Sequence, residues 1–237
     1  MIDRNPRWYH TIDLGAHGVT PGMIDLRRIA PKVLPRDLAG RRALDVGTFD
    51  GFWAFELERR GAEVVATDVA AIDDADWPPH RREHLRAEAQ RLGVELGLGF
   101  RIASEALGSR VRRVECDVRA LSPEAVGGPV DVAFCGALLL HLRDPVGALE
   151  RVRSTLAPGG MLLLLEPVLL WPSLVRRPLA RFQPAETAFN WWVPNVAALR
   201  AWAQVAGFAS VRTRGLHRPP GREGLRHWHA ALEARPG

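Results

Sequence analysis

Two glycines and a carboxylate in the first third of the chain have the spacing of a nucleoside-binding site. The apolar run 43–46 leads into Gly47 and Gly51, and a second apolar run ends at Asp68. A strand, a glycine turn, a helix and a second strand ending in a carboxylate open many nucleoside-binding α/β folds. The glycines let backbone approach the ligand, and a carboxylate roughly 20 residues beyond the turn can accept hydrogen bonds from both ribose hydroxyls. The sequence therefore predicts a ligand with a free ribose diol.

The spacing within the turn disfavours a dinucleotide. A pyrophosphate-binding turn reads G-x-G-x-x-G, and its second glycine lets the backbone reach the phosphates. Here the pattern is D-x-G-x-x-x-G from Asp45 to Gly51, and Phe49 stands where that second glycine would be. NAD and FAD are therefore disfavoured as cofactors.

The second half of the chain resembles the later strands of class I S-adenosylmethionine methyltransferases. An apolar run at 130–135, a helical segment from Pro145, a Pro-Gly-Gly turn at 158–160 and a buried strand at 161–166 follow the order of that superfamily. The resemblance implies a Rossmann-like α/β fold, with a seven-stranded, mostly parallel sheet and an antiparallel edge strand. It also implies S-adenosyl-L-methionine as the cofactor.

The same resemblance implies which residues hold the cofactor. Asp117, with Val118, follows the expected strand 111–117, where the superfamily usually places a carboxylate that faces the adenine amino group. The set of residues expected to contact the cofactor is Asp45, Gly47, Thr48, Phe49, Asp50, Gly51, Asp68, Val69, Asp117, Val118, Cys135 and Gly136.

Four segments narrow the resemblance, over nearly the whole chain, to the family related to the tRNA wobble-uridine carboxymethyltransferase CmoB. They are residues 8–14, 19–22, 45–53 and 189–195. The founding enzyme of that family uses carboxy-S-adenosylmethionine, and many shorter relatives look like ordinary methyltransferases.

Two departures from the founding pattern favour plain S-adenosylmethionine. The family's Leu-Tyr-His, whose tyrosine helps to hold the extra carboxylate, is Leu139-Leu140-His141 here, and the only lysine, Lys32, lies in a different setting from the lysine the family uses. A buried carboxylate would lose about 1 to 3 kcal/mol for each missing partner.

His10 and His141 are the candidate catalytic residues. Methyl transfer is an in-line displacement, so a base is needed only when the nucleophile arrives protonated. His141 follows the fourth strand, whose carboxyl end lies where ligands gather in such sheets, although packing or capping would also explain it. His10 belongs to a Trp-x-His pattern shared with the family. The candidate substrate contacts are Tyr9, Arg181, Trp191 and Trp192, for which lid packing and solvated loop charges are the alternatives.

Two histidine patterns have spacings that also occur in metal sites. His80 and His84 belong to an H-x-x-E-H pattern, and His227 and His229 would share one face of a strand. Neither pattern has an evident further ligand, and short motifs often match by chance. We propose no metal.

We expect one α/β domain with two insertions. Residues 1–40 should form a cap of one or two helices, and residues 41–237 the cofactor-binding core, with insertions at about 73–101 and 167–190. The second insertion should be a lid or docking loop without regular elements, because it is rich in proline. A helix with Asn195 as its N-cap follows, and strands near 210–214 and 226–232 should close the sheet.

The composition favours a soluble cytoplasmic enzyme without a membrane partner. The chain has 237 residues, 47% of them hydrophobic, a formal charge of +5 and a pI near 10.4. No apolar run reaches the about 18 residues that a spanning helix needs, and the first residues lack the apolar stretch of a signal peptide. Cys116 and Cys135 have no C-x-x-C spacing, so reduced thiols are expected.

Three functions remain open at this stage. The leading one is methyl transfer to a small-molecule acceptor, with an oxygen as the candidate nucleophile. The second is a tRNA wobble-uridine methyl- or carboxymethyltransferase, for which the excess of arginine is weak support because charged residues usually form a solvated face. The third is a nucleoside-binding protein without catalysis. Oligomeric state is not indicated.

Overall fold

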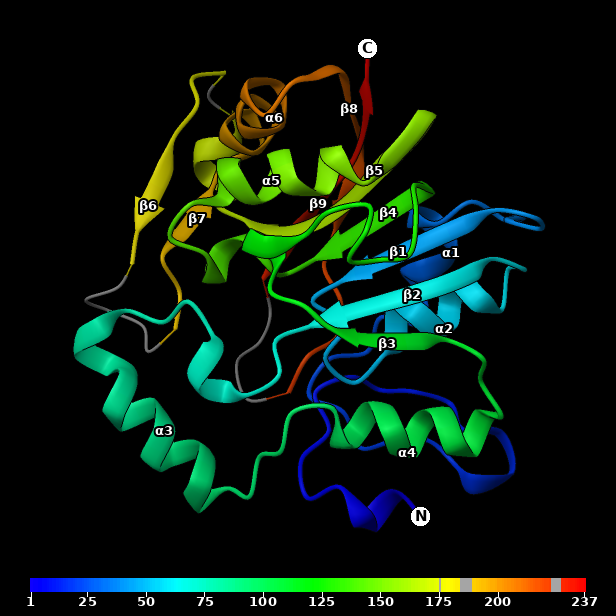
Figure 1. Ribbon diagram of the computed structural model, residues 1–237. Coiled ribbons are helices and arrows are strands. Elements are labelled where there is room, and N and C mark those ends of the chain that lie inside the picture. Colours follow the sequence, from blue (N-terminus) through cyan, green and yellow to red (C-terminus); the bar gives the residue numbers. More distant parts are fainter. Residues whose placement is uncertain (175, 184–188, 223–226) are drawn as a thin grey trace.

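A seven-stranded sheet forms the centre of the computed structural model, which describes residues 1–174, 176–183, 189–222 and 227–237 (Figure 1). The strand order is β3-β2-β1-β4-β5-β9-β8. Strands β3 through β5 pair in parallel, and β9 pairs antiparallel with both β5 and β8. The predicted seven-stranded, mostly parallel sheet with antiparallel pairing at one edge is confirmed.

The elements alternate along the chain as the sequence pattern indicated. The strands of the main sheet are β1 (Arg42–Val46), β2 (Glu63–Asp68), β3 (Arg112–Glu115), β4 (Val130–Gly136), β5 (Leu156–Val168), β8 (Phe208–His217) and β9 (Trp228–Pro236). The α-helices are α1 (Ala30–Val33), α2 (Phe52–Glu58), α3 (Arg82–Arg91), α4 (Leu98–Leu107), α5 (Pro145–Ser154) and α6 (Val196–Val205).

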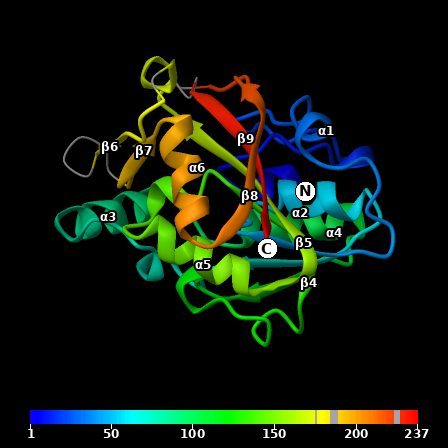
Figure 2. The same cartoon turned by 90° about the horizontal axis from the view of Figure 1, so that it is seen from above.

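Helices cover both faces of the sheet. α1, α2 and α4 lie on one face, and α5 and α6 lie on the other (Figures 1 and 2). Each face has its own cluster of buried apolar side chains, and the alternation of β1 separates them: Ala43 belongs to one cluster, and Leu44 and Val46 to the other. Burial on both faces is typical of parallel strands.

The N-terminal segment is part of the first core and not a separate helical cap. Trp8, Ile12 and Leu14 are at most 2% exposed and belong to the same apolar cluster as α2. Before β1 the segment contains only the 3-10 turns η1 (Ile2–Arg4) and η2 (Gly15–His17) and the four-residue α1. The expected cap of one or two helices is therefore mostly extended chain and turns.

The second insertion has more regular structure than expected. β5 continues to Val168, a 3-10 turn η7 spans Trp171–Leu174, and β6 (Ala180–Phe182) pairs antiparallel with β7 (Trp192–Pro194). This correction has a simple cause: Pro167 lies next to the end of β5, Pro172 is the second residue of η7, and Pro178 lies between η7 and β6, so none of them interrupts the middle of a strand. Part of the insertion, 184–188, is outside the described residues.

The closing strands differ in extent from the expected ones, and one histidine prediction changes with them. β8 extends beyond the expected 210–214 at both ends, and β9 begins and ends later than the expected 226–232. β9 begins at Trp228, so His227 precedes the strand and does not share a strand face with His229. Among the described helices, none combines the length and the apolar character needed to cross a membrane.

Candidate functional site

The candidate site lies where the chain changes direction across the sheet. From β1 the chain adds β2 and β3 on one side, and then returns to place β4 and β5 on the other. Ligands of open α/β sheets bind at such a switch point, outside the carboxyl ends of the strands. The turns after β1 and β4 meet here, because a side chain at Gly47 would come 3.1 Å from the Leu138 Cδ1 atom.

Asp68 fixes the glycine turn from the neighbouring strand. Its Oδ2 atom accepts a hydrogen bond of 2.8 Å from the Phe49 backbone N–H, and its Oδ1 atom accepts one of 2.9 Å from that of Val69. Phe49 has a φ of 47°, a left-handed conformation that is uncommon for a bulky residue, and Gly47 and Gly51 are at 74° and 90°. The turn is thus held in a strained shape, as is frequent at ligand sites.

Three buried polar atoms in or beside this turn have no hydrogen-bond partner among the described residues. They are Asp45 Oδ2, Thr48 Oγ1 and His10 Nδ1, in residues only 1%, 2% and 7% exposed. An unbonded buried polar atom costs about 1 to 3 kcal/mol, so such atoms mark places where a polar ligand can complete the bonding. The ammonium, carboxylate and ribose hydroxyls of S-adenosylmethionine fit this combination of donors and acceptors.

The turn also concentrates buried carboxyl groups. Burial raises the pKa of Asp45 to about 7, and the charge of Asp68 acts in the same direction. Burial raises the pKa of Asp50 to about 6, although backbone hydrogen bonds from His10 and Tyr9 oppose the shift. A cationic ligand group close to these carboxyls would favour their ionised form.

Asp50 connects the turn to the N-terminal segment. One carboxylate oxygen, Oδ2, accepts hydrogen bonds from the backbone N–H groups of Tyr9 at 2.7 Å and His10 at 3.0 Å. The Tyr9 ring meets the Phe49 ring edge-on, with centroids 5.8 Å apart. Tyr9 and His10 are therefore placed directly against the predicted cofactor turn, which the sequence indicated only through the family pattern.

His10 is a buried, neutral group. Burial lowers its pKa to about 3, its ring stacks on Phe52 with centroids 5.8 Å apart, and its Nδ1 atom lies 4.0 Å from Asp50 Oδ2. Such an imidazole can accept or donate a hydrogen bond at neutral pH, but it cannot supply a positive charge.

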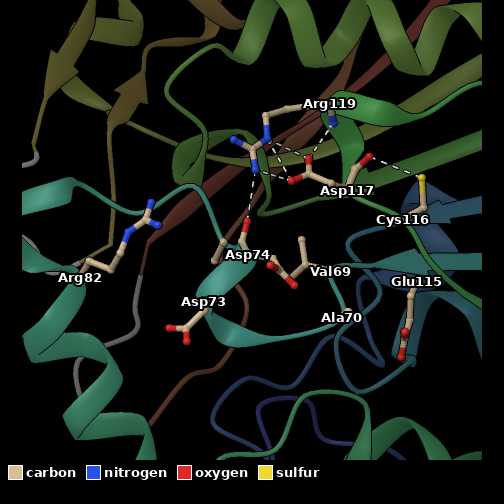
Figure 3. A pocket seen from close by; sticks show the side chains of 10 residues that line it. Val69, Ala70, Asp73, Asp74, Arg82, Glu115, Cys116, Asp117 and Arg119 are labelled. Atoms are coloured by element: carbon tan, nitrogen blue, oxygen red, sulfur yellow. Dashed lines mark hydrogen bonds and ion pairs between the residues drawn. The ribbon is translucent and has the colours of Figure 1, made fainter.

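A cavity of about 420 Å³ opens at the ends of β2 and β3, and Val69, Cys116 and Asp117 are among the residues that line it. Figure 3 shows Asp117 and Arg119 turned toward each other, and the guanidinium Nε atom donates to the carboxylate at 2.9 and 3.0 Å. Asp117 thus lies at the expected place, but the carboxylate is engaged by Arg119. The Val118 side chain is 7% exposed and belongs to the second apolar cluster.

Glu166 is a functional candidate that the sequence analysis missed. It lies near the end of β5, is 1% exposed, and accepts hydrogen bonds from the backbone N–H groups of Leu138 at 3.0 Å and Leu139 at 3.2 Å. Cys135, which is fully buried, places its Sγ atom 3.8 Å from the same carboxylate oxygen. Burial raises the pKa of Glu166 to about 7. A single acidic residue within the apolar run 161–168 was the available signal.

The turn that Glu166 holds carries His141. The 3-10 turn η6 (Leu139–His141) begins one residue after Leu138, whose backbone N–H donates to Glu166. The His141 Nδ1 atom lies 3.1 Å from the Phe189 carbonyl oxygen. Burial lowers the pKa of His141. A neutral ring whose Nδ1–H donates to that carbonyl has its lone pair on Nε2, which is the form a general base requires.

Trp191 and Trp192, two of the predicted substrate contacts, follow the lid insertion (about 167–190) and bond to the first insertion, to the η6 turn and to the residues just after it. The Trp191 Nε1–H donates to the Asp76 carbonyl oxygen, and its backbone N–H donates to the Leu140 carbonyl oxygen at 2.7 Å. The Trp192 Nε1–H donates to the Arg143 carbonyl oxygen at 3.1 Å. Both indole N–H groups are thus used for packing. Trp191 is also only 8% exposed, with the Arg143 guanidinium carbon 4.8 Å from its ring centroid, so Trp192 has the more accessible ring of the two.

Asp76 is the shared partner in this region. Its Oδ2 atom accepts a hydrogen bond of 2.7 Å from the Arg143 backbone N–H, and its Oδ1 atom lies 3.8 Å from Arg119 Nη1. A continuous set of contacts therefore runs from the cavity that Asp117 lines to the lid. Arg181 lies on β6 opposite Val193, and its side chain is exposed.

The histidine patterns do not assemble a metal centre in the described part of the chain. His80 and His84 are exposed, and no group of three or more His, Cys, Asp or Glu residues there is arranged to hold a metal ion.

The strand order with its switch point, and the glycine turn between β1 and α2, define an α/β fold of the Rossmann-like class. Residues 24–213 match a family described as a methyltransferase domain, and the chain belongs to that family. The chain therefore contains a methyltransferase domain, and the expected class of protein is confirmed.

Sequence relatives include tRNA U34 carboxymethyltransferases. The protein from Azotobacter vinelandii is 29% identical over 187 residues, covering 78% of this chain and 50% of that protein. The protein from Pseudomonas paraeruginosa is 30% identical over 187 residues, which cover 78% of this chain and 49% of that protein. This chain thus spans about half the length of these relatives, and the expected resemblance to their family is confirmed.

Solved structures support the fold. The Burkholderia thailandensis 1,6-didemethyltoxoflavin-N1-methyltransferase, crystallised with its substrate and S-adenosylhomocysteine, has a TM-score of 0.56 at 19% identity over 90% of this chain and 78% of that chain. The PH0226 protein of Pyrococcus horikoshii has a TM-score of 0.54 at 15% identity, and the match covers 90% of this chain and 88% of that chain.

Proposed function

We propose that this protein transfers the methyl group of S-adenosylmethionine to a hydroxyl oxygen of a small-molecule acceptor. His141 removes the proton of the hydroxyl, and the glycine turn holds the cofactor. The oxygen then forms a bond to the methyl carbon as the carbon–sulfur bond breaks, and S-adenosylhomocysteine leaves with the electron pair on sulfur.

One observation carries the choice of His141. Its Nδ1 atom is 3.1 Å from the Phe189 carbonyl oxygen, and burial lowers its pKa. Burial favours the neutral ring, although the hydrogen bond to the Phe189 carbonyl acts on the pKa in the opposite direction. That hydrogen bond places the proton of the neutral ring on Nδ1, so that Nε2 is the accepting atom. His10 is also neutral, but its ring lies against Asp50 and Phe52, beside the turn assigned to the cofactor. We therefore assign His10 a contact with the cofactor or acceptor and assign the proton transfer to His141.

The acceptor side is aromatic. Phe189 has its ring centroid 5.3 Å from that of His141, and Phe182 lies 4.9 Å from Trp192 and 6.4 Å from Trp191. Phe182 and Phe189 remain 56% and 46% exposed. Aromatic faces favour a planar, apolar acceptor, and Tyr9 and Arg181 are the proposed polar contacts to it.

The cofactor contacts follow from the geometry of the turn. Asp68 is assigned the ribose hydroxyls, and Asp45 and Asp50 the positive end of the cofactor. Gly47, Thr48, Phe49, Gly51 and Gly136 offer backbone at the switch point, and Val69 and Asp117 line the cavity at its side. The Val118 and Cys135 side chains are buried, so only their backbone atoms are assigned to this site.

Modification of tRNA at the wobble uridine is the second candidate function, and the names of the sequence relatives support it. Against it, Leu140 replaces the family tyrosine, and Leu140 is 8% exposed with its carbonyl bonded to Trp191. A leucine side chain offers no hydrogen bond to the extra carboxylate of carboxy-S-adenosylmethionine.

Calorimetric titration with S-adenosylmethionine and with its carboxylated analogue separates the two candidates. Tighter binding of the plain cofactor, followed by methyl transfer to small phenolic acceptors that is lost in His141→Ala and unaffected by added tRNA, is the expected result. Tighter binding of the carboxylated analogue, together with turnover on unmodified tRNA, would replace the first candidate with the second.

A further inference from the structure

The segment between β5 and the end of β6, described at residues 169–174 and 176–183, is both apolar and basic. Residues 169–183 contain three arginines, Arg176, Arg177 and Arg181, and no aspartate or glutamate. The remaining side chains are mostly large and apolar. The acceptor site uses only Phe182 and Arg181 of this segment, so most of it serves no purpose in the proposed reaction.

The apolar side chains of this segment point into solvent to an unusual degree. Trp171 is 81% exposed and Leu174 is 74% exposed, and Leu179 is 47% exposed. Trp171 and Leu174 are the first and last residues of η7. Residues three apart in a 3-10 helix lie on the same side of it, so these two side chains form one small apolar patch. Exposed apolar patches with a polar rim mark interaction sites.

The adjoining charge is positive. Arg176 and Arg177 are the second and third residues after the end of η7 in the sequence, and both are exposed. An anionic surface would attract each of them by about 1 kcal/mol, while a tryptophan ring and leucine side chains enter the apolar layer below the headgroups. We propose that residues 169–174 and 176–183 dock this protein on the surface of a membrane that contains anionic lipids.

The composition favours a lipid surface over RNA. Binding of RNA relies on phosphate contacts and on bases stacked on aromatic rings. Leu170, Leu174 and Leu179 provide neither, although all three are exposed. Insertion into a lipid interface uses leucine, tryptophan and arginine together. The absence of spanning helices in the described residues is compatible with surface docking, which requires none.

The position of the segment suits this role. β6 lies at the outer margin of the molecule, beyond β7, in both views (Figures 1 and 2). β7 carries Trp192, which contacts Phe182 of β6. Docking therefore brings the aromatic acceptor side close to the surface, and an apolar acceptor dissolved in the membrane could reach it. The proposal goes beyond the transfer reaction and is tested without it.

Co-sedimentation of the whole protein with vesicles tests the proposal. Vesicles of phosphatidylcholine alone are compared with vesicles that also contain phosphatidylglycerol, at low ionic strength. We expect binding only to the anionic vesicles. Trp171→Ala/Leu174→Ala should weaken it about tenfold or more, since two large apolar contacts are lost. Arg176→Glu/Arg177→Glu should weaken it by a similar factor.

Matched variants control for surface composition and charge. Val205→Ala removes apolar surface at a residue that is 72% exposed at the far end of α6, and Arg110→Glu/Arg212→Glu makes the same change of charge elsewhere. Both should bind vesicles like the wild type. Absence of vesicle binding by the wild type would overturn the proposal, as would equal losses in the control variants, or binding to RNA that the Trp171 and Leu174 substitutions abolish. None of these results depends on turnover.

Discussion

The cofactor side and the acceptor side of the sheet edge are built in different ways. At the cofactor side, buried carboxylates accept hydrogen bonds from backbone N–H groups, as Asp68 and Asp50 do. At the proposed acceptor side, an exposed ring contacts a half-buried one, as Phe182 and Trp192 do. Backbone held by buried charge gives a fixed site for a constant cofactor, whereas exposed rings can change without disturbing the core. Substitutions on the two sides should therefore differ in size and in kind.

The largest effect is expected for Asp68→Ala. This substitution removes the partner of the Phe49 and Val69 N–H groups and the proposed acceptor of the ribose hydroxyls. Charge-assisted hydrogen bonds contribute about 1.5 to 3 kcal/mol each, so the Kd for S-adenosylmethionine should rise about 100-fold or more. Calorimetric titration measures it. Asp68→Asn keeps one accepting oxygen, so its Kd should lie between that of Asp68→Ala and that of the wild type. An unchanged Kd would refute the assignment of Asp68.

Asp50→Ala should separate the N-terminal segment from the turn. The Tyr9 and His10 N–H groups would lose their common acceptor. The expected decrease in the free energy of unfolding is about 2 to 4 kcal/mol, measured by urea denaturation. Asp50→Asn retains an accepting oxygen in the same place and should lose less than half of that amount. If the free energy of unfolding decreased equally in Asp50→Ala and Asp50→Asn, the charge of Asp50, and not its hydrogen bonds, would hold the N-terminal segment against the turn.

Glu166→Gln tests the buried carboxyl through pH. The folded-state pKa of about 7 lies above the ordinary value of 4.5, so the folded protein binds the proton more tightly than the unfolded chain. Its contribution to stability is therefore complete below about pH 4.5 and decreases as the pH rises to about 7, by up to about 3 kcal/mol. In Glu166→Gln, urea denaturation across this range should show a shallower decrease.

Glu63→Gln is the control for this experiment. Glu63 has a side chain that is 74% exposed, on β2, so the same substitution there changes no buried group. Parallel pH profiles for the wild type and Glu166→Gln would show that Glu166 keeps an ordinary pKa.

The smallest effect on the cofactor is expected from the lid. Phe182→Ala/Trp192→Ala removes a ring contact and the hydrogen bond to the Arg143 carbonyl oxygen. Because neither side chain contacts the glycine turn, the Kd for S-adenosylmethionine should stay within about twofold of the wild-type value. The KM for the acceptor should rise about tenfold, since apolar contact is lost. A large change in the cofactor Kd would mean that the two sides are coupled, with Asp76 as the connecting residue.

Much of the cofactor side could be predicted because it is encoded locally. The order of strand, glycine turn, helix and carboxylate appears within residues 42–68, and the structure places Asp68 against Phe49 as that order requires. The contacts of Asp117 and of the tryptophans were less accessible to prediction. Asp117 is bonded to Arg119 within one short turn, a contact that the sequence analysis did not consider, whereas Trp191 is bonded to Asp76 because of how the first insertion folds. The sequence pattern marked that insertion only as an interruption.

The sequence by itself determined the fold class, the glycine turn after the first strand and the resemblance to its family, because strand periodicity and glycine positions act over a few neighbouring residues. Only the tertiary structure decided that Glu166 supports the turn of His141, that Phe189 orients the His141 ring, and that Asp50 holds the N-terminal segment. Each of these contacts joins residues far apart in the chain, and their distance depends on the packing of the whole sheet edge. No local pattern of residue types carries that information.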